Sequence, residues 1–279
     1  MLRGRSSSCP ANVEACSDDE GAPGKRRSLS GRSSSPAPTQ RGFLEVFSGS
    51  QTLSTVFVKA SHPTRTFDIK DNDDEDMHDA QAVDRLLTIV KDMTKKAGGR
   101  PPYVHLAPPC CTYSNARYPK IRSSQHPSGL PSKDLPQKAR ATLKYANAIT
   151  DNTLKVMMRL VDMGVPHTIE QPWASLMQKE KSFKRWAAVS GAGRRMVDQC
   201  MFGMPYRKRT ALWCFPNTLL DGLERQCNHN GHAVTLSKWD RPRADRPSVC
   251  LATNMGSSAY PIGLCQQWYK TVVRNLASC

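Results

Sequence analysis

The chain has 279 residues, enough for one sizeable α/β domain or two small ones. It carries 40 lysines and arginines against 24 aspartates and glutamates, a formal net charge of +16, which favours a polyanionic partner such as a nucleic acid over a merely solvated basic surface. No apolar run approaches the roughly 20 residues of a membrane span and no apolar leader opens the chain, so we expect an intracellular protein, nuclear if the source is eukaryotic, with no membrane partner.

The first 41 residues differ in composition from the rest. Residues 1–41 are rich in serine, arginine, proline and glycine and hold almost no large apolar side chains. Such a segment cannot bury enough apolar surface to offset its ordering entropy, so we predict a disordered basic tail. The ten cysteines of the chain form no regular framework, and we interpret them as reduced thiols.

From residue 43 onward, short apolar segments alternate with amphipathic ones. Strands are predicted at 43–47, 64–68, 103–106, 166–170, 196–201 and 211–215. Helices are predicted at 51–60, 83–90, 138–163 and 264–272, the second from apolar residues at i, i+3, i+4 and i+7. This alternation indicates βαβ units, and therefore an α/β fold with a Rossmann-like, doubly wound, mostly parallel sheet over residues 42–279.

Small or acidic residues follow the first two predicted strands, at the sheet edge where ligands bind in such folds. The turn Phe47-Ser48-Gly49 lets a backbone approach a cofactor, although one glycine after a strand is usually only a turn. Asp68 ends the second strand, where a carboxylate accepts hydrogen bonds from a ribose diol or caps a helix. Asp79, in an acidic stretch, is a further candidate for contact with an adenine amino group.

The segment Pro108-Pro109-Cys110-Cys111 follows the third predicted strand. The prolines restrict the backbone and hold the next thiol out of the sheet, where a thiolate can attack an electrophilic carbon; a buried structural cysteine is the alternative. Glu170 ends the neighbouring predicted strand, where its carboxylate is either functional or the cap of a helix. If the backbone at Arg207 and Arg209 is extended, their side chains lie on the same face. They then bind a base or a phosphate; the alternative is a solvated basic loop.

Together and in this order, these segments resemble the cytosine-C5 DNA methyltransferase family. Phe47-Ser48-Gly49 matches the family's Phe-x-Gly motif, and Pro109-Cys110 with Tyr113-Ser114 matches its Pro-Cys motif. Glu170-Gln171-Pro172 takes the place of Glu-Asn-Val, and Arg207 and Arg209 take that of the arginines in Gln-x-Arg-x-Arg. The resemblance covers about residues 43–276.

The resemblance implies a class I methyltransferase fold, S-adenosylmethionine as cofactor, and methylation of carbon 5 of a cytosine flipped out of DNA. It makes Cys110 the nucleophile that adds to carbon 6, while Glu170 binds N3 and the amino group and Arg209 binds O2. Arg207 supports the loop or a phosphate. The residues that bind the cofactor are then Phe47, Ser48, Gly49, Asp68, Asp79 and Pro109. RNA as the substrate, and a catalytically inactive nucleic-acid-binding relative, are the alternatives.

Several positions depart from the family pattern. Gln51 and Thr52 replace the second and third glycines of the cofactor motif, Gln171 replaces the asparagine, and Cys111 replaces a glutamine beside the nucleophile. Residues 216–258 are far fewer than a full target-recognition domain contains. We therefore expect short-context selectivity, or an accessory subunit that reads the sequence.

A polar loop at 115–129 carries Arg117, Lys120 and Arg122, and we expect it to close over the flipped base. Six basic residues later in the chain are candidates for phosphate contacts, which position a nucleic acid without specifying its sequence: Lys179, Lys181, Lys184, Arg185, Arg194 and Arg195.

The short stretch 216–258 is either a reduced recognition region or a metal-binding insertion. Cys227, His229 and His232 can bind metal, but a structural zinc needs a fourth ligand, for which Cys214 and Cys250 are the candidates. The spacing fits no standard zinc finger, so no metal is assigned from the sequence.

Deletion of residues 1–40 should leave cooperative melting and basal activity unchanged, because the tail holds no predicted core residue. Affinity for nucleic acid should fall at moderate salt, since the tail's basic residues are lost. Thermal melting and salt-dependent binding of the full and shortened chains test both points. Loss of cooperative melting would mean that the tail packs against the domain.

Overall fold

In the computed structural model, the described residues are 40–115, 117–234, 236–237, 251–252 and 259–277. The predicted basic tail therefore lies almost wholly outside the described residues, as do Cys250 and part of the stretch 216–258. Within the described ranges, no helix combines the length and apolarity that crossing a bilayer requires.

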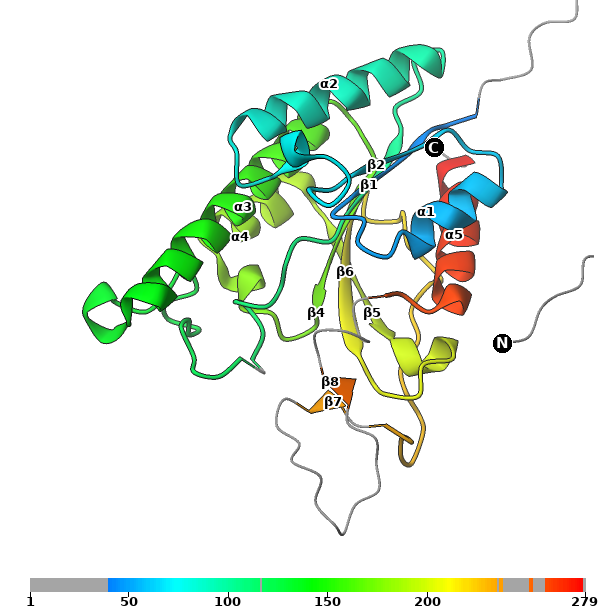
Figure 1. Cartoon of the computed structure of the whole chain (residues 1–279). Coiled ribbons are helices and arrows are strands. Elements are labelled where there is room, and N and C mark those ends of the chain that lie inside the picture. The colour runs from blue at the N-terminus through cyan, green and yellow to red at the C-terminus, as the bar shows by residue number, and fades with distance from the viewer. Residues whose placement is uncertain (1–39, 116, 235, 238–250, 253–258, 278–279) are drawn as a thin grey trace, which may run out of the picture. The chain divides into compact units, whose positions relative to one another are not determined.

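Strands and helices alternate along the chain (Figure 1). The strands are β1 (Phe43–Val46), β2 (Thr64–Phe67), β3 (Tyr103–Leu106), β4 (His167–Pro172), β5 (Gly193–Asp198), β6 (Arg209–Phe215), β7 (Leu236–Ser237) and β8 (Leu251–Ala252). The α-helices are α1 (Thr52–Lys59), α2 (Gln81–Lys96), α3 (Gln137–Asp162), α4 (Lys181–Ser190) and α5 (Ile262–Ala277). Single turns of 3-10 helix are η1 (Asp73–Glu75), η2 (Ser132–Asp134), η3 (Leu176–Lys179) and η4 (Gln199–Phe202).

Six strands form one sheet in the order β2-β1-β3-β4-β6-β5. β1 pairs in parallel with β2 and β3, and β3 pairs in parallel with β4. β6 is antiparallel to both β4 and β5, so β5 runs in the same direction as the first four strands. The prediction of an α/β, Rossmann-like, doubly wound and mostly parallel sheet is confirmed, and five strands have their carboxyl ends at one edge.

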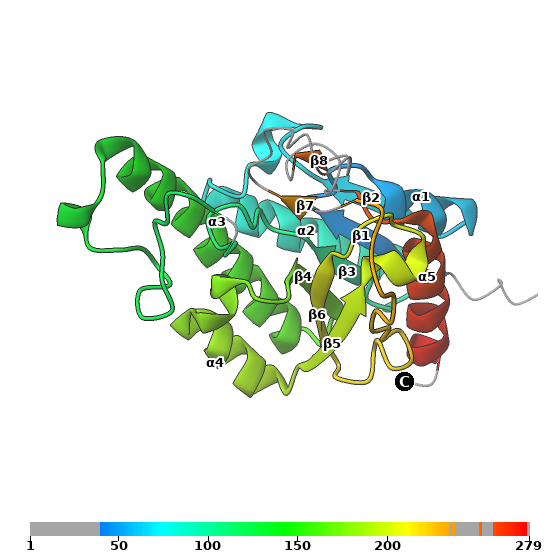
Figure 2. The same cartoon turned by 90° about the horizontal axis from the view of Figure 1, so that it is seen from below.

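Helices cover both faces of this sheet. α2, α3 and α4 lie on one side and α1 and α5 on the other, as Figures 1 and 2 both show. Alternate residues of each strand enter the two cores, as the period of a β-strand requires: Leu44 and Val46 pack toward α2–α4, while Phe43 packs with Trp268 and the rest of the α1/α5 core.

The face under α1 and α5 holds a row of buried polar side chains. Glu45, His105 and Thr168 are neighbours in register on three adjacent strands. The Thr168 hydroxyl lies 2.6 Å from the Tyr103 hydroxyl and 2.8 Å from His105 Nδ1, and His105 Nε2 lies 3.1 Å from the hydroxyl of Tyr260. Burial lowers the pKa of His105 to about 3, so its ring is neutral. The network ties β3 and β4 to the segment that leads into α5.

Replacing the central hydroxyl of this network should destabilise the protein. Thr168→Val keeps the shape but leaves the Tyr103 hydroxyl and His105 Nδ1 without this partner, a cost of about 1–3 kcal/mol. Thr168→Ser keeps the hydroxyl and loses one methyl, a cost of roughly 1 kcal/mol. Urea denaturation at constant slope measures both. A serine variant less stable than the valine variant would show that packing, not hydrogen bonding, decides this position.

Candidate active site

The candidate residues gather along the carboxyl edge of the sheet because consecutive parallel strands end there. Across the first four strands, the residues at this edge are Asp68 after β2, Gly49 after β1, Cys110 after β3 and Glu170 in β4. Acidic Asp198 ends β5, and the basic segment 207–209 leads into β6 beside it.

The turn after β1 has an unusual backbone. Phe47, Gly49 and Gln51 all have positive φ, at 60°, 49° and 55°. Gln51 therefore adopts the left-handed conformation that a glycine takes readily, and its side chain donates to Asp71 Oδ2 at 2.9 Å. The buried hydroxyl of Ser48 has no hydrogen-bond partner among the described residues. The turn thus keeps a glycine-like shape where the family's second glycine is replaced.

The carboxylate of Asp68 joins the ends of β1 and β2. Its Oδ2 accepts from the Gly49 N–H at 2.9 Å, and its Oδ1 accepts from the Lys70 N–H at 3.0 Å. Its own N–H donates to Glu75 at 2.8 Å. The next side chain, Ile69, is 45% exposed although it is large and apolar. A carboxylate and an exposed apolar side chain therefore stand together at this strand end.

Two other predicted cofactor residues have different surroundings. Asp79 Oδ1 accepts from the Gln81 N–H at the start of α2, and Asp79 Oδ2 pairs with Arg85 at 2.6 Å. The hydrogen bond from Arg85 lowers the pKa of Asp79 below its usual value. Both carboxylate oxygens of Asp79 are thus used within the protein, and Pro109 is exposed.

The segment that carries Cys110 is fixed from β4. The fully buried Gln171 donates from Nε2 to the carbonyl of Pro108 at 3.0 Å and accepts from the Ser175 hydroxyl at 2.8 Å. The carbonyl of Cys110 accepts from the N–H groups of Tyr113 and Ser114, at 3.0 and 2.9 Å, which closes a tight turn. The glutamine in place of the family's asparagine thereby sets the position of the cysteine.

The two adjacent thiols have different environments: Cys110 is half-buried and Cys111 is exposed. Glu170 is buried, and its Oε1 has no hydrogen-bond partner among the described residues, although Lys208 Nζ lies 3.8 Å away. Burial and then the nearby charge of Glu170 raise the pKa of Cys110 to about 11, while Lys208 acts in the opposite direction. Cys110, Glu170 and Lys208 thus form one electrostatically linked group, with a protonated thiol at neutral pH.

The two predicted arginines bind a different carboxylate. Arg209 makes two hydrogen bonds of 2.9 Å to the fully buried Asp198, and Arg207 lies 3.5 Å from the same group. Because side chains alternate in extended backbone, Lys208 between them lies beside Glu170 instead. Lys208 was not among the residues predicted from the sequence, although the alternation of side-chain directions along 207–209 could have indicated it.

The loop 115–129 is anchored through Arg122, which is only 2% exposed. Its guanidinium stacks on Tyr113 at 3.7 Å and donates to Asn147 Oδ1 at 2.7 Å, and it lies 3.6 Å from Glu180. Burial and these partners hold Arg122 inside the protein. Lys120 in the same loop is exposed.

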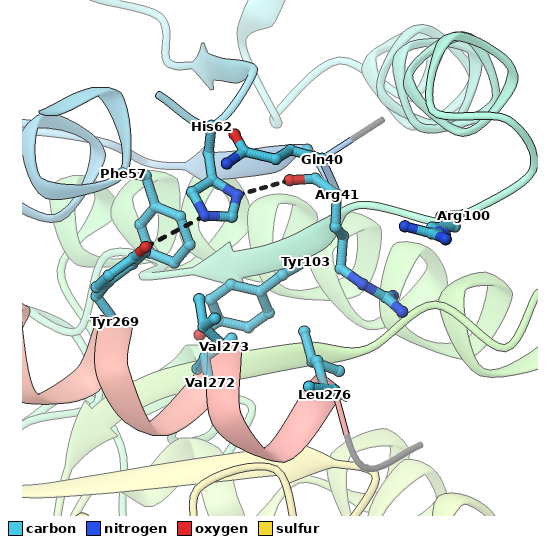
Figure 3. Close-up of a pocket in the computed structure, with 12 residues that line it drawn as sticks. Gln40, Arg41, Phe57, His62, Arg100, Tyr103, Tyr269, Val272, Val273 and Leu276 are labelled. Carbon is cyan, nitrogen blue, oxygen red and sulfur yellow. Dashed lines mark hydrogen bonds between the residues drawn. The ribbon is translucent and has the colours of Figure 1, made fainter. Parts of the chain in front are cut away.

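A separate pocket of about 630 Å³ lies at the opposite end of the strands (Figure 3). Arg41 before β1, Arg100 before β3 and Leu276 near the end of α5 line it. His62 stands at its wall, with Nδ1 2.9 Å from the Arg41 carbonyl and Nε2 3.3 Å from the Tyr269 hydroxyl. None of the predicted site residues lines this pocket.

No family model matches the chain, and no curated protein matches it. Among solved structures, it is similar to the Entamoeba histolytica methyltransferase EhMeth, with a TM-score of 0.39 and 13% identity over 69% of this chain and 57% of that one. A mutant of Spodoptera frugiperda DNMT2 (TM-score 0.34, 12% identity, 67% and 53%) and the S. pombe Dnmt2 methyltransferase (0.35, 12%, 63% and 50%) are also similar. The chain thus spans little more than half the length of these proteins, and similarities of this size do not assign it a function.

The rate at which Cys110 is alkylated should depend on the charges of Glu170 and Lys208 beside it. Because the pKa of Cys110 is about 11, its rate of reaction with iodoacetamide should still be rising at pH 10. Glu170→Gln removes a negative charge, lowers this pKa and should speed alkylation at pH 8 by roughly threefold or more. Lys208→Met removes a positive charge and should slow it.

Peptide mapping after timed alkylation separates Cys110 from Cys111, which serves as the internal reference. A rate for Cys110 that levels off below pH 8 would contradict the raised pKa. Equal rates in the parent and the Glu170→Gln variant would place the carboxylate outside electrostatic reach of the thiol.

Proposed function

We propose that this chain is an S-adenosylmethionine-dependent methyltransferase that methylates carbon 5 of cytosine in DNA through a covalent bond between Cys110 and carbon 6. The observation that carries this proposal is the meeting of Cys110, Glu170 and Lys208 at the carboxyl edge of the sheet. On the neighbouring strands β1 and β2, the same edge holds the left-handed turn around Gly49 and the carboxylate of Asp68.

The residues around Gly49 and Asp68 fit S-adenosylmethionine. Asp68 would bind its ribose, as carboxylates at this strand end do in dinucleotide-binding folds. Exposed Ile69 would pack against its adenine, and the Ser48 hydroxyl, which has no partner in the described part of the chain, could hydrogen-bond to a ligand. When bound, the cofactor supplies an electrophilic methyl group. The glycine-like backbone of Gln51 supports a working cofactor turn over an inactive relative.

Cytosine needs activation because carbon 5 of its aromatic ring is a poor nucleophile. Addition of the Cys110 sulfur to carbon 6 makes carbon 5 the nucleophilic end of an enamine and moves negative charge toward N3 and O2. Carbon 5 would then take the methyl group as the bond between that methyl and the sulfonium sulfur breaks, which leaves a neutral thioether. Carbon 5 would lose its proton to a base, and the returning electron pair would expel the sulfur of Cys110. No oxidant or reductant takes part.

Glu170 is suited to hold the ring during this addition. Its buried Oε1 has no hydrogen-bond partner among the described residues and lies 3.8 Å from Lys208 Nζ, and burying such a group is costly unless a ligand completes its bonding. We infer that Glu170 binds the N3 edge and amino group of the base, while Lys208 supplies the positive charge beside it. Since the thiol of Cys110 is protonated at neutral pH, its proton would pass to the neighbouring Glu170 carboxylate and on to N3 as the sulfur adds to carbon 6, which neutralises the charge that develops there.

Arg207 and Arg209 act, in this proposal, as positioning residues. Both are held by Asp198, and the Gln199 N–H donates to the Lys208 carbonyl at 3.1 Å, which fixes the backbone between them. The net charge of +16 supports a nucleic-acid substrate, and DNA is the substrate to which the motifs point. An accessory specificity subunit and a nuclear location remain predictions.

The adjacent thiols supply the decisive test. Purified protein is incubated with labelled S-adenosylmethionine and either DNA or RNA, and the nucleosides are separated by mass spectrometry. Cys110→Ser should abolish formation of 5-methylcytosine, because a hydroxyl at neutral pH is a far weaker nucleophile than a thiolate. The matched variant Cys111→Ser should keep a substantial fraction of the activity.

A substrate containing 5-fluorocytosine should trap the protein, since fluorine cannot leave as a proton, and a peptide map should find the adduct on Cys110. An adduct on Cys111 would exchange the roles of the two thiols. Methylation of RNA alone would overturn the DNA assignment and leave the chemistry standing. Cofactor binding without any adduct or product would overturn the cytosine-C5 mechanism itself.

A further inference from the structure

Four metal-binding side chains converge beside the end of β5. Cys200 lies in η4, directly after β5, and Cys227, His229 and His232 lie in a loop much later in the chain. The Cys227 sulfur is 3.4 Å from His229 Nδ1 and 3.4 Å from His232 Nε2. All four ligand atoms lie within 4.8 Å of one another.

These separations suit a tetrahedral zinc ion. With Zn–S bonds of about 2.3 Å and Zn–N bonds of about 2.0–2.1 Å, tetrahedral geometry places neighbouring ligand atoms roughly 3.3–3.8 Å apart. The two sulfur–nitrogen distances already fall in that range. Two thiolates and two neutral imidazoles also balance the charge of a divalent ion. We propose that Cys200, Cys227, His229 and His232 bind one structural zinc ion.

The surrounding loop supports this assignment independently. Between Glu224 and Val234 every side chain is exposed or only partly buried, so no buried apolar residue anchors the loop. Small structural units that cannot build a hydrophobic core of their own are commonly held by a disulfide or a structural metal. Because all four positions are filled by protein ligands, the site leaves no open position for catalysis.

The sequence-based candidates for the fourth ligand lie elsewhere. Cys214 pairs in register with Gly193 at the start of β5, whereas Cys200 follows the other end of that strand. The Cys214 sulfur instead contacts the Asn217 carbonyl at 3.3 Å. Cys250 lies outside the described residues.

The loop 224–234, which carries three of the four proposed zinc ligands, is hydrogen-bonded to the candidate active site. The Cys227 N–H donates to Asp198 Oδ2 at 2.8 Å, so the carboxylate that holds Arg207 and Arg209 also holds a zinc ligand. The Val234 N–H donates to the Pro205 carbonyl at 3.1 Å, just before the segment 207–209. The ion would therefore fix the backbone that carries Lys208. The zinc assignment itself does not depend on the methyltransferase proposal.

The full chain, purified without added metal, should contain close to one zinc ion per molecule by elemental analysis. After exchange, Co²⁺ should give the intense visible absorption of a tetrahedral thiolate–imidazole site. His229→Ala is the sharpest variant because His229 is exposed, so its loss creates no cavity; zinc affinity should fall by more than about tenfold.

His126→Ala, at an exposed histidine outside the cluster, is the matched control and should keep the zinc. A chain that contains no zinc and gives no tetrahedral Co²⁺ spectrum would overturn the inference, as would a disulfide between Cys200 and Cys227 found by mass spectrometry. If the His229→Ala variant binds zinc with the parental affinity, His229 is not a zinc ligand and the proposed set of four ligands is wrong. Zinc present in a protein without methyltransferase activity would leave this inference standing and count against the proposed function alone.

Discussion

The fully buried carboxylate of Asp198 is the interaction on which the candidate site depends most. A charge without solvent is strongly unfavourable unless it is paired, and Asp198 is satisfied by the two arginines of the segment 207–209 and by the backbone of Cys227. Arg209 supplies most of this pairing through two hydrogen bonds of 2.9 Å, and Arg207 adds a longer contact of 3.5 Å. The lysine between them is consequently held toward Glu170.

A second constraint comes from the parallel sheet. Because β1, β2, β3 and β4 run in one direction, the turns that follow them meet at a single edge, with the proposed cofactor residues on β1 and β2 and the proposed reacting residues on β3 and β4. Gln171 fixes the position of the segment that carries Cys110, because its side-chain amide links β4 to the carbonyl of Pro108. A methyl donor and a base bound at these two places would be adjacent without any further rearrangement of the sheet.

The sequence alone predicted the parts of the structure that depend on hydrophobic periodicity and on the residues at the ends of strands. Strand–helix alternation predicted the sheet, and the residues at strand ends predicted where Gly49, Asp68, Cys110 and Glu170 gather. Helix α4 was missed because its buried face consists of little more than Phe183 and Trp186, too short a pattern to stand out.

Contacts between segments that are far apart in the chain could not be predicted from a single sequence. The burial of Arg122 depends on Asn147 and Glu180, which belong to other elements. Cys200 could not be joined to Cys227 because only the turn after β5 and its pairing with a later loop bring the two together. The direction of a single side chain, as at Lys208, likewise depends on which carboxylates the fold has already placed nearby.

The raised pKa of Cys110 has a consequence for the durability of the protein. Peroxides and disulfides react with thiolates, whereas a protonated thiol is nearly inert toward them. If Cys110 acts as proposed, a thiol that stays protonated until a nucleic-acid base is bound would be spared from oxidation between encounters with substrate. Cys111, at the adjacent position, is exposed and therefore accessible to oxidants in solution. Oxidative damage would then accumulate first on Cys111, and the proposed nucleophile Cys110 would remain intact.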